Sequence, residues 1–457
     1  MMDTATAARA VDGRIVGGNV PFTRVATDSR SLAAGDLFVA IKGERFDGHD
    51  FVSTAFERGA AAALVGEHRA ATLAGNLVVV RDPLAALGQL AAHWRARFAI
   101  PVIVVVGSNG KTTVKEMLAV ILRAHYGERR VLATQGNLNN AIGLPLTLLG
   151  LRDEHAVAAI ELGMNHPGET AELAPIAQPT VALINNAQRE HQEFMHSIQE
   201  VAIEHAALVR ALRAEGTAVL NADDPSVDVW RAAARERSGV RIVDFALAHP
   251  AAIRMRGAPA ASDAMLVTTP AGDAKFSLHA PGRHNMSNAL AAAGAAFAIG
   301  VPLPAIVAGL EAFRPVAGRL ATLHTPGGFT VIDDSYNANP DSVRAAIDVL
   351  AAAPSPRWLV LGDMGEVGAG GPQFHHEVGA YARAAGIDRL LTVGTLTASS
   401  AAAFGAAAAQ FTFIEELIAD LAASARPGTT ILVKGSRVMR MERVVAALTG
   451  NALAGTH

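Results

Sequence analysis

Apolar residues recur along this chain in short runs separated by stretches with helical spacing. The run Val102–Val106 is β-branched throughout and predicts a buried strand. Comparable apolar runs follow helical stretches at Val157–Leu162, Val181–Asn185 and Thr217–Asn221. From about residue 100 to 313 strands therefore alternate with helices, which predicts a mostly parallel sheet. Residues 241–280 are less regular, and we expect antiparallel strands there.

Two further α/β segments flank this central region. Before it, Asp36–Ile41 is predicted as a strand and Phe51–Ala63 as a helix, and an Ala-rich helix from about Leu84 to Phe98 leads into the central strand. After a hinge at Arg314–Arg319, a second α/β series begins. Its predicted strands are Phe329–Asp333, Trp358–Leu361, Leu390–Val393 and Thr430–Val433. We therefore predict an α/β protein of three domains, at residues 1–84, 85–313 and 314–457.

Composition agrees with this division and excludes several functions. A length of 457 residues favours about three domains, and 51% apolar residues suffice for several cores. The net charge of −3 argues against nucleic-acid or membrane-surface binding. The absence of cysteine excludes disulfides, thiolate catalysis and Cys-ligated zinc.

We expect a cytoplasmic protein without membrane insertion. The first residues have no apolar core of a signal peptide. The uncharged segment Ala289–Leu310 is long enough for a membrane span, but Pro302 and Pro304 interrupt it. Two helices separated by a proline turn are the better interpretation.

The segment from Gly107 to Thr113 has the features of a phosphate-binding loop. A glycine turn joins the strand to a helix that opens on Lys111. In such loops the backbone N–H groups and the helix N-terminus face an anion. Lys111 would reach the β- and γ-phosphates of ATP, and the Thr112 hydroxyl would hold Mg²⁺. The expected ATP-binding residues are Gly107, Ser108, Asn109, Gly110, Lys111, Thr112 and Thr113.

Polar residues follow two other strands of the same predicted sheet. Glu161 is placed to make a second contact to Mg²⁺, although a helix N-terminal charge or a surface ion pair would also explain it. His191 is a candidate site residue because it follows a strand, whereas an isolated histidine is more often structural. The loop with Asn137, Asn139 and Asn140 either binds a sugar or peptide or simply forms turns.

The C-terminal strands also end in candidate ligand residues. Asp334 could bind a ribose, and Tyr336 could stack on a base. Lysine is scarce in this chain, so Lys42, Lys111 and Lys434 are suspected of roles that need a compact ammonium group. The residues expected to neutralise phosphate or carboxylate are Arg319, Lys434 and Arg437.

Together these motifs resemble the Mur ligase family. The loop has two residues between its glycines where the standard loop has four, and this short form is the family's variant, shared with folylpolyglutamate synthetases. The likeness covers nearly the whole chain, and the segments DDSYNANP and LGDMGEVG resemble the branch that adds D-alanyl-D-alanine to UDP-N-acetylmuramoyl-tripeptide. The matching stretches are Thr27–Phe51, Gly136–Pro145, Glu161–Glu169, Pro281–Ala292, Asp333–Pro340, Leu361–Gly368 and Val433–Arg437.

The resemblance implies a fold and a reaction. It implies a small UDP-sugar-binding domain, a central mononucleotide-binding domain and a Rossmann-like domain for the incoming dipeptide. The tripeptide carboxylate would attack the γ-phosphate of ATP, and the dipeptide amine would then displace phosphate from the acyl phosphate. The partners would be ATP, the UDP-tripeptide and D-alanyl-D-alanine, with Mg²⁺ as cofactor and no nucleic acid, and we expect a monomer.

The resemblance also implies roles for individual residues. His191 matches the family's ligand of a second magnesium ion, and the expected catalytic residues are Lys111, Glu161 and His191. Ser29, Arg30 and Lys42 lie in the segment that matches the uridine-nucleotide domain. The adenine, ribose and phosphate contacts match Asn288, Asp334 and Arg319, and the dipeptide or phosphate would meet Asn337, Lys434, Ser436 and Arg437.

One departure concerns the second magnesium ion. Many relatives carry a carbamylated lysine on the helix after the histidine, but no lysine occurs here between Lys115 and Lys275. Our hypothesis is that Glu204 or His205 takes over its electrostatic role, directly or through water. The alternative is a weaker second metal site.

Two other functions would also use a phosphate-binding loop of this kind. One is a related ligase with another amino acid, of the diaminopimelate-adding or folylpolyglutamate type, which the branch-specific motifs disfavour. The other is a nucleotide-switched binding module, which the N-terminal segment and the Lys434 motif disfavour.

Overall fold

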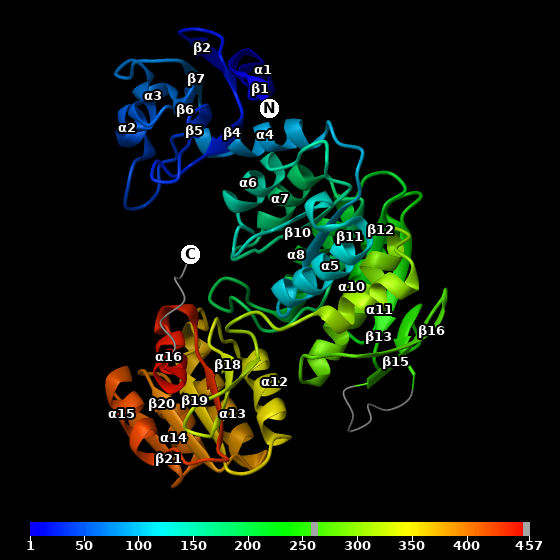
Figure 1. The fold of residues 1–457 in the computed structure, drawn as a ribbon, viewed down its shortest axis with the longest axis vertical. Coiled ribbons are helices and arrows are strands. Elements are labelled where there is room, and N and C mark those ends of the chain that lie inside the picture. The colour runs from blue at the N-terminus through cyan, green and yellow to red at the C-terminus, as the bar shows by residue number, and fades with distance from the viewer. Residues whose placement is uncertain (257–263, 451–457) are drawn as a thin grey trace.

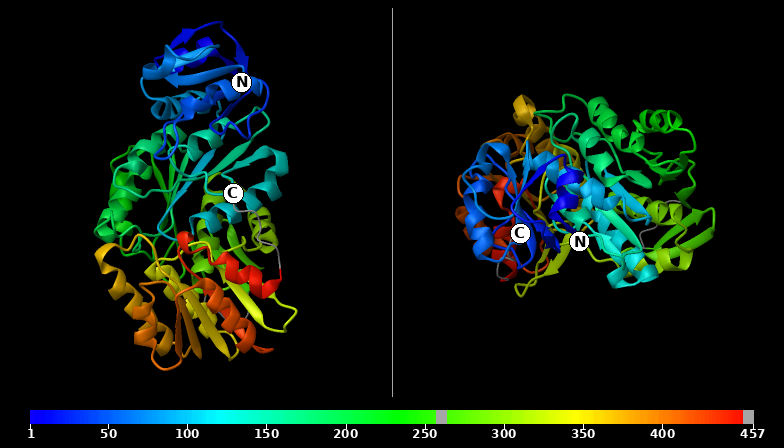
Figure 2. Two further views of the ribbon diagram at one scale, coloured as in Figure 1. Left: turned by 90° about the vertical axis from the view of Figure 1, so that its left-hand side faces the viewer. Right: turned by 90° about the horizontal axis from the view of Figure 1, so that it is seen from above.

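The computed structural model describes residues 1–256 and 264–450. Within these ranges the strands form three main sheets, one in each of three bodies stacked along the long axis (Figure 1). The N-terminal body lies at one end, the C-terminal body at the other and the central body between them, as the side view also shows (Figure 2). The predicted three-domain α/β fold is confirmed. Residues 257–263, inside the stretch expected to hold antiparallel strands, and 451–457 lie outside the described ranges.

The central sheet has the strand order β16-β15-β14-β13-β12-β11-β8-β10-β9. Neighbours from β9 across to β14 run parallel, whereas β15 and β16 are antiparallel. The mostly parallel sheet is thus confirmed, and the irregular stretch holds both kinds of pairing. The strands are β8 (Val102–Val106), β9 (Val131–Ala133), β10 (Val157–Glu161), β11 (Val181–Ile184), β12 (Thr217–Asn221), β13 (Arg241–Ala246), β14 (Ile253–Met255), β15 (Ala264–Thr269) and β16 (Gly272–Ser277).

Helices cover both faces of the central sheet. In β8, Val102 and Val104 belong to the core on one face, and Ile103 and Val105 to the core on the other, because strand side chains alternate. The helices of the first face are α4 (Pro83–Arg95), α6 (Gly143–Leu149), α7 (Glu169–Ala177), α8 (Ile198–Arg210) and α9 (Val227–Arg235). Those of the second are α5 (Lys111–Tyr126), α10 (Arg283–Ala298) and α11 (Leu303–Ala312).

The C-terminal sheet has the order β17-β18-β22-β19-β20-β21, with only β17 antiparallel to its neighbour among the described strands. The strands are β17 (Ala321–His324), β18 (Thr330–Asp334), β19 (Arg357–Gly362), β20 (Arg389–Val393), β21 (Ala408–Phe411) and β22 (Thr430–Lys434). One face packs on α12 (Pro340–Ala351), α13 (Gly371–Ala384) and α14 (Ala398–Phe404), and the other on α15 (Ile414–Ser424) and α16 (Glu442–Thr449). The edge strands β17 and β21 were not predicted, because they are short and half-exposed.

The N-terminal sheet has the order β2-β7-β6-β5-β4, and β1 pairs with β3 beside it. The elements are β1 (Met2–Asp3), α1 (Thr4–Ala10), β2 (Arg14–Val16), β3 (Pro21–Phe22), β4 (Arg24–Ala26), β5 (Asp36–Val39), α2 (Val52–Glu57), β6 (Ala62–Gly66), α3 (Glu67–Ala70) and β7 (Leu77–Val80). The helix predicted over Phe51–Ala63 is too long. Helix α2 ends at Glu57, Gly59 follows with a φ of +95°, and the chain enters β6 at Ala62.

Short 3₁₀ helices and the proline-broken helix pair complete the fold. The 3₁₀ helices are η1 (Gly48–Phe51), η2 (Glu128–Arg130), η3 (Gly368–Gly370) and η4 (Arg437–Met439). The uncharged segment forms the end of α10 and most of α11, as predicted. Among the described residues, no helix has the length and apolar character needed to cross a membrane.

Candidate active site

The predicted phosphate-binding loop joins the end of β8 to the start of α5. Gly107 and Gly110 have φ of +145° and +82°. A Cβ atom on Gly110 would lie 2.5 Å from Oδ1 of Asn288 and 2.8 Å from Nδ2 of Asn185. Asn185 Nδ2 donates to the backbone oxygen of Asn109 at 2.8 Å and to Oδ1 of Asn288 at 2.9 Å. Both its conformation and this close approach therefore require glycine at position 110.

The Lys111 ammonium group folds back against its own loop. Its Nζ donates to the backbone oxygen of Gly107 at 2.6 Å and lies 3.3 Å from Oε2 of Glu190, which is 5% exposed. Burial by itself would raise the pKa of Glu190. The neighbouring Lys111, together with the contacts to His205 and His191, outweighs burial and holds that pKa well below its ordinary value. Glu190 is therefore ionised and keeps Lys111 beside the N-terminus of α5.

Glu161, at the end of β10, brings a buried carboxylate to the same region. Its Oε1 accepts a hydrogen bond from Nδ2 of Asn139 at 2.7 Å, and its backbone N–H donates to Oγ1 of Thr134 at 2.9 Å. Oε2 is buried and has no hydrogen-bond partner among the described residues. A buried carboxylate oxygen without a donor is costly unless a cation neutralises it. Together with the Thr112 hydroxyl on the first turn of α5, Glu161 therefore fits the oxygen ligands that Mg²⁺ prefers.

His191 lies in the loop after β11, with φ of +46°. Its Nδ1 is 2.5 Å from Oε2 of Glu366 in the C-terminal body, and its Nε2 is 3.8 Å from Oε2 of Glu190. The contact with His191 lowers the pKa of Glu366. The backbone N–H of Glu193 donates to the backbone oxygen of Glu366 at 3.1 Å. The C-terminal body therefore contacts the loop that carries the candidate metal ligand.

The candidate residues of the C-terminal body lie at the ends of two adjacent strands. Asp334 of β18 is paired in register with Lys434 of β22. Lys434, 3% exposed, donates from Nζ to Oδ2 of Asp334 at 2.6 Å and to the backbone oxygen of Asn337 at 2.8 Å. The guanidinium carbons of Arg319 and Arg437 lie 4.2 and 5.4 Å from the ring centre of Tyr336. Cation–π contact therefore gathers two arginines around one aromatic ring.

One cavity of about 1720 Å³ brings most of the predicted site residues together across the central and C-terminal bodies. Those that line it are Ser108, Asn109, Gly110, Lys111, Thr112, Thr113, Asn137, Asn139, Asn140, Glu161, His191, Asn288, Arg319, Asp334, Tyr336, Asn337, Lys434, Ser436 and Arg437.

Other predicted residues do not line this cavity. Ser29, Arg30 and Lys42 lie in the N-terminal body, where the exposed Arg30 pairs with Asp28 at 2.7 Å. Gly107 belongs to the loop but is not in the lining.

Glu204 and His205 also lie outside the cavity lining. Both Glu204 oxygens accept backbone N–H groups at the start of α7, from Gly168 at 2.8 Å and Thr170 at 2.6 Å. His205 is 1% exposed, and its Nε2 lies 3.5 Å from Oε1 of Glu190.

Sequence reasoning missed two residues of the loop after β11. Glu190 faces Lys111, and Arg189 forms ion pairs with Asp341 and Glu377 of the C-terminal body. Arg189 and Glu190 directly precede His191 in the sequence, and this position was the one signal that they belong to the site.

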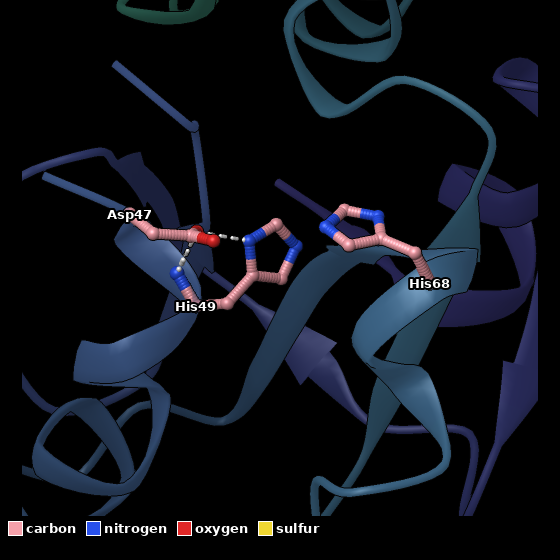
Figure 3. Close-up of side chains that lie close together, drawn as sticks. All are labelled: Asp47, His49 and His68. Carbon is pink, nitrogen blue, oxygen red and sulfur yellow. Dashed lines mark hydrogen bonds and ion pairs between the residues drawn. The ribbon is translucent and has the colours of Figure 1, made fainter. Parts of the chain in front are cut away.

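A second group of ionisable residues lies in the N-terminal body (Figure 3). Ligand atoms of Asp47, His49 and His68 lie within 4.8 Å of one another, a spacing compatible with a metal ion. Both ring nitrogens of His49 are already engaged, however. Nδ1 lies 2.6 Å from Oδ1 of Asp47, and Nε2 accepts the backbone N–H of Gly66 at 2.8 Å. His49 therefore serves to hold β6 and the preceding loop together.

A phosphate-binding loop that shares one cavity with the strand ends of a second α/β body defines a nucleotide-dependent enzyme that works between two domains. Three family models match the chain: "Mur ligase family, catalytic domain" over residues 21–95, "Mur ligase middle domain" over 105–296 and "Mur ligase, glutamate ligase domain" over 318–437. The chain belongs to the Mur ligase family, as its motifs predicted.

Full-length relatives support this assignment. The chain is 40% identical to the UDP-N-acetylmuramoyl-tripeptide–D-alanyl-D-alanine ligase of Escherichia coli (strain K12), over 96% of this chain and 97% of the relative. A crystal structure of MurF from Acinetobacter baumannii is similar with a TM-score of 0.90 and 34% identity, covering 98% of this chain and 99% of that one. MurF ligase from Thermotoga maritima in complex with ADP has a TM-score of 0.82 and 25% identity, covering 93% and 97%.

Proposed function

We propose that this protein ligates D-alanyl-D-alanine to UDP-N-acetylmuramoyl-tripeptide with consumption of ATP, giving the pentapeptide precursor of peptidoglycan. The observation that carries the proposal is the shared cavity, which is lined both by the loop around Lys111 and by Asp334, Lys434 and Arg437. The E. coli relative that carries this activity in its name matches nearly the whole chain. A cavity of this size between two domains suits a reaction that joins three substrates.

In the first step a carboxylate oxygen of the tripeptide attacks the γ-phosphorus of ATP. The new O–P bond gives an acyl phosphate, and the bond to the β-phosphate oxygen breaks to release ADP. Such transfers need positioning and charge neutralisation more than covalent help from the protein. Lys111 and the N–H groups at the start of α5 supply positive charge where the phosphates bind.

Thr112, Glu161 and His191 are the residues that would hold magnesium. The unpartnered Oε2 of Glu161 supports this assignment, because a buried carboxylate oxygen needs a cation or a donor. Bound Mg²⁺ supplies further neutralisation of the phosphate oxygens.

In the second step the dipeptide amine, as the free base, attacks the acyl carbon. The C–N bond forms, the bond from carbon to the phosphate oxygen breaks, and phosphate leaves while the nitrogen loses a proton to solvent. We assign Asn337, Lys434, Ser436 and Arg437 to the dipeptide carboxylate or the phosphate, because they lie at the strand ends of the C-terminal sheet. Asn288, Arg319, Asp334 and Tyr336 are assigned to the nucleotide.

The remaining assignments concern the UDP-sugar and the domains. Residues 1–84 are proposed to bind the uridine nucleotide through Ser29, Arg30 and Lys42. The sugar and peptide would extend to Asn137, Asn139 and Asn140 at the cavity. Residues 85–313 would bind ATP and residues 314–457 the dipeptide, in a monomer that works in the cytoplasm.

The test measures phosphate release with ATP, the UDP-tripeptide and D-alanyl-D-alanine, leaving out each in turn. We expect turnover only with all three, together with a pentapeptide product detected by mass spectrometry. Replacement of the dipeptide by diaminopimelate or glutamate should give no product. Turnover that ignored the dipeptide would contradict the proposed ligase activity.

A further inference from the structure

Glu190 is a buried carboxylate that has nitrogen atoms of Lys111, His191 and His205 within 4 Å. Its Oε2 lies 3.3 Å from Nζ of Lys111 and 3.8 Å from Nε2 of His191. Its Oε1 lies 3.5 Å from Nε2 of His205 but has no hydrogen-bond partner among the described residues. Buried polar atoms in folded proteins almost always have a partner, so this oxygen requires an explanation.

The surroundings of Glu190 contain other buried atoms without partners. Neither ring nitrogen of His205 makes a hydrogen bond in the described structure, although the residue is 1% exposed. Glu161 Oε2, at the end of β10 on the other side of β8, has none either. Glu190 Oε1 and His205 Nε2 face each other at 3.5 Å, whereas Glu190 and His191 both line the cavity, and carboxylate and imidazole groups beside a phosphate site are ligands that divalent cations use.

We propose that Glu190 is the carboxylate of a second divalent-cation site beside the phosphate-binding loop, with His191 as its neighbouring ligand and His205 as the positioning residue. The proposal rests on the ligase function proposed above. It revises the hypothesis drawn from the sequence, because Glu204 is already engaged in capping α7.

The distances suit two ligands of one small cation. Cis ligands of an octahedral Mg²⁺ lie about 3 Å apart, since each metal–ligand bond is about 2.1 Å. The 3.8 Å between Glu190 Oε2 and His191 Nε2 needs an adjustment of about 1 Å to reach that value. Glu190 also lines the cavity and is therefore within reach of a cation that arrives with the nucleotide.

A role only as counter-ion to Lys111 leaves part of this arrangement unexplained. Lys111 meets Oε2 and already has the backbone oxygen of Gly107 as a second acceptor. Oε1 points to His205 instead, which lies on α8 and does not line the cavity. His205 can fix the orientation of the carboxylate, as outer-shell partners of metal ligands commonly do.

The experiment counts bound cations rather than turnover. The full-length protein with a non-hydrolysable ATP analogue is titrated with Mn²⁺ and followed by electron paramagnetic resonance. We expect two Mn²⁺ ions per chain for the unmodified protein and one for Glu190→Gln, which keeps the side-chain size. Glu172→Gln is the matched control, because Glu172 is an exposed carboxylate at the same cavity, and it should keep both ions.

Two further variants test the ligand set. Glu190→Asp retains the charge on a shorter side chain and should restore the second ion with weaker affinity. His205→Ala should weaken that ion by about 10- to 100-fold without changing the first, as expected for an outer-shell residue. Thermal melting of each variant checks that the chain is folded.

The outcomes separate this inference from the ligase function. Two ions retained in Glu190→Gln, or a single ion in the unmodified protein, would overturn the second site while dipeptide-dependent phosphate release still supported the ligase. If Glu190 served only as counter-ion to Lys111, Glu190→Gln would keep both ions and bind the ATP analogue more tightly in the presence of a chelator. A loss of dipeptide dependence would instead contradict the proposed function.

Discussion

Arg189 and Asp341 form a bidentate ion pair that joins the central body to the C-terminal body. The Nη2 and Nε atoms of Arg189 lie 2.5 and 3.1 Å from Oδ1 of Asp341, and the Arg189 backbone N–H donates to Oδ2 at 2.9 Å. Nη1 donates to Oε2 of Glu377, also in the C-terminal body, at 2.8 Å. Since Glu190 and His191 follow directly, this pair fixes their loop relative to the C-terminal domain.

Loss of this link should impair use of the dipeptide more than binding of the nucleotide. For Arg189→Ala we expect kcat/KM for D-alanyl-D-alanine to fall about tenfold. Charged hydrogen bonds contribute about 1.5–3 kcal/mol each when well formed, and the partial exposure of the Arg189 guanidinium reduces that contribution. The measurement is steady-state phosphate release at varied dipeptide. Arg344→Ala is the control, since Arg344 meets Glu377 from within the C-terminal body at 3.0 Å. Equal losses in both variants would contradict a role between the domains.

Much of the site could be predicted because parallel strands bring their carboxyl ends to one edge of a sheet. Glu161, His191, Asp334 and Lys434 each follow a short apolar run, and all four line the same cavity. The phosphate-binding loop could be predicted because its chemistry depends on consecutive residues. Predicting these features requires no knowledge of which strands are neighbours in the sheet.

Features that depend on strand order or on distant contacts could not be predicted. Lys111 and Glu190 are 79 positions apart and meet because β11 pairs with β8. The alanines Ala60–Ala63 suit a helix or a buried strand equally well, and only packing against β5 and β7 makes part of them β6. In such segments tertiary contacts override the intrinsic secondary-structure propensity of the residues.

Gly110 should not tolerate alanine. Gly110→Ala would place Cβ 2.5 Å from Oδ1 of Asn288 at a φ of +82°. We expect the free energy of unfolding to fall by about 1–3 kcal/mol and ADP affinity to fall with it. Gly168→Ala, at the start of α7, has a similar left-handed backbone conformation (φ +95° and ψ −20°, against φ +82° and ψ −1° at Gly110) but no atom within 4 Å of its Cβ, so it isolates the cost of the backbone conformation. Urea unfolding and ADP titration measure both variants, and equal losses would exclude the clash.

His375 should make stability fall at acidic pH. Burial lowers the pKa of His375 from its ordinary value of 6.5, and Nε2 accepts the backbone N–H of Met364 at 2.9 Å while Nδ1 donates to Gly371. Just below pH 6.5, therefore, the imidazole of His375 binds a proton in the unfolded chain but not in the folded chain. This contribution to stability is complete above pH 6.5 and is lost as pH falls below it, by at most about 1.4 kcal/mol per pH unit.

The measurement compares urea unfolding between about pH 7.5 and about pH 5.5, the range in which histidine titrates. His375→Gln removes the titrating group and should flatten this part of the pH dependence. His376→Gln changes an exposed neighbour and should follow the unmodified protein. Identical slopes in all three proteins would show that His375 is not responsible.

Lys111 should be indispensable for turnover, although Lys115 lies one helical turn away. Lys115 is fully buried and pairs with Glu116, so it cannot replace the missing ammonium group. For Lys111→Ala we expect kcat to fall by at least about 10²- to 10³-fold, because the charge that meets the phosphates is lost. The same variant should be less stable by about 1–3 kcal/mol, since Glu190 loses its nearest cation.

A double variant separates these two effects of Lys111. In Lys111→Ala/Glu190→Gln the buried negative charge is also removed, so urea unfolding should show recovered stability, while affinity for the ATP analogue in the presence of a chelator should stay as low as in Lys111→Ala. Recovery of both would mean that Lys111 acts only by neutralising Glu190. A near-normal rate in Lys111→Ala alone would remove Lys111 from phosphate binding altogether. Because the electrostatic cost to the fold and the loss of phosphate binding are measured independently, the pair of variants distinguishes a structural lysine from one that binds the phosphates.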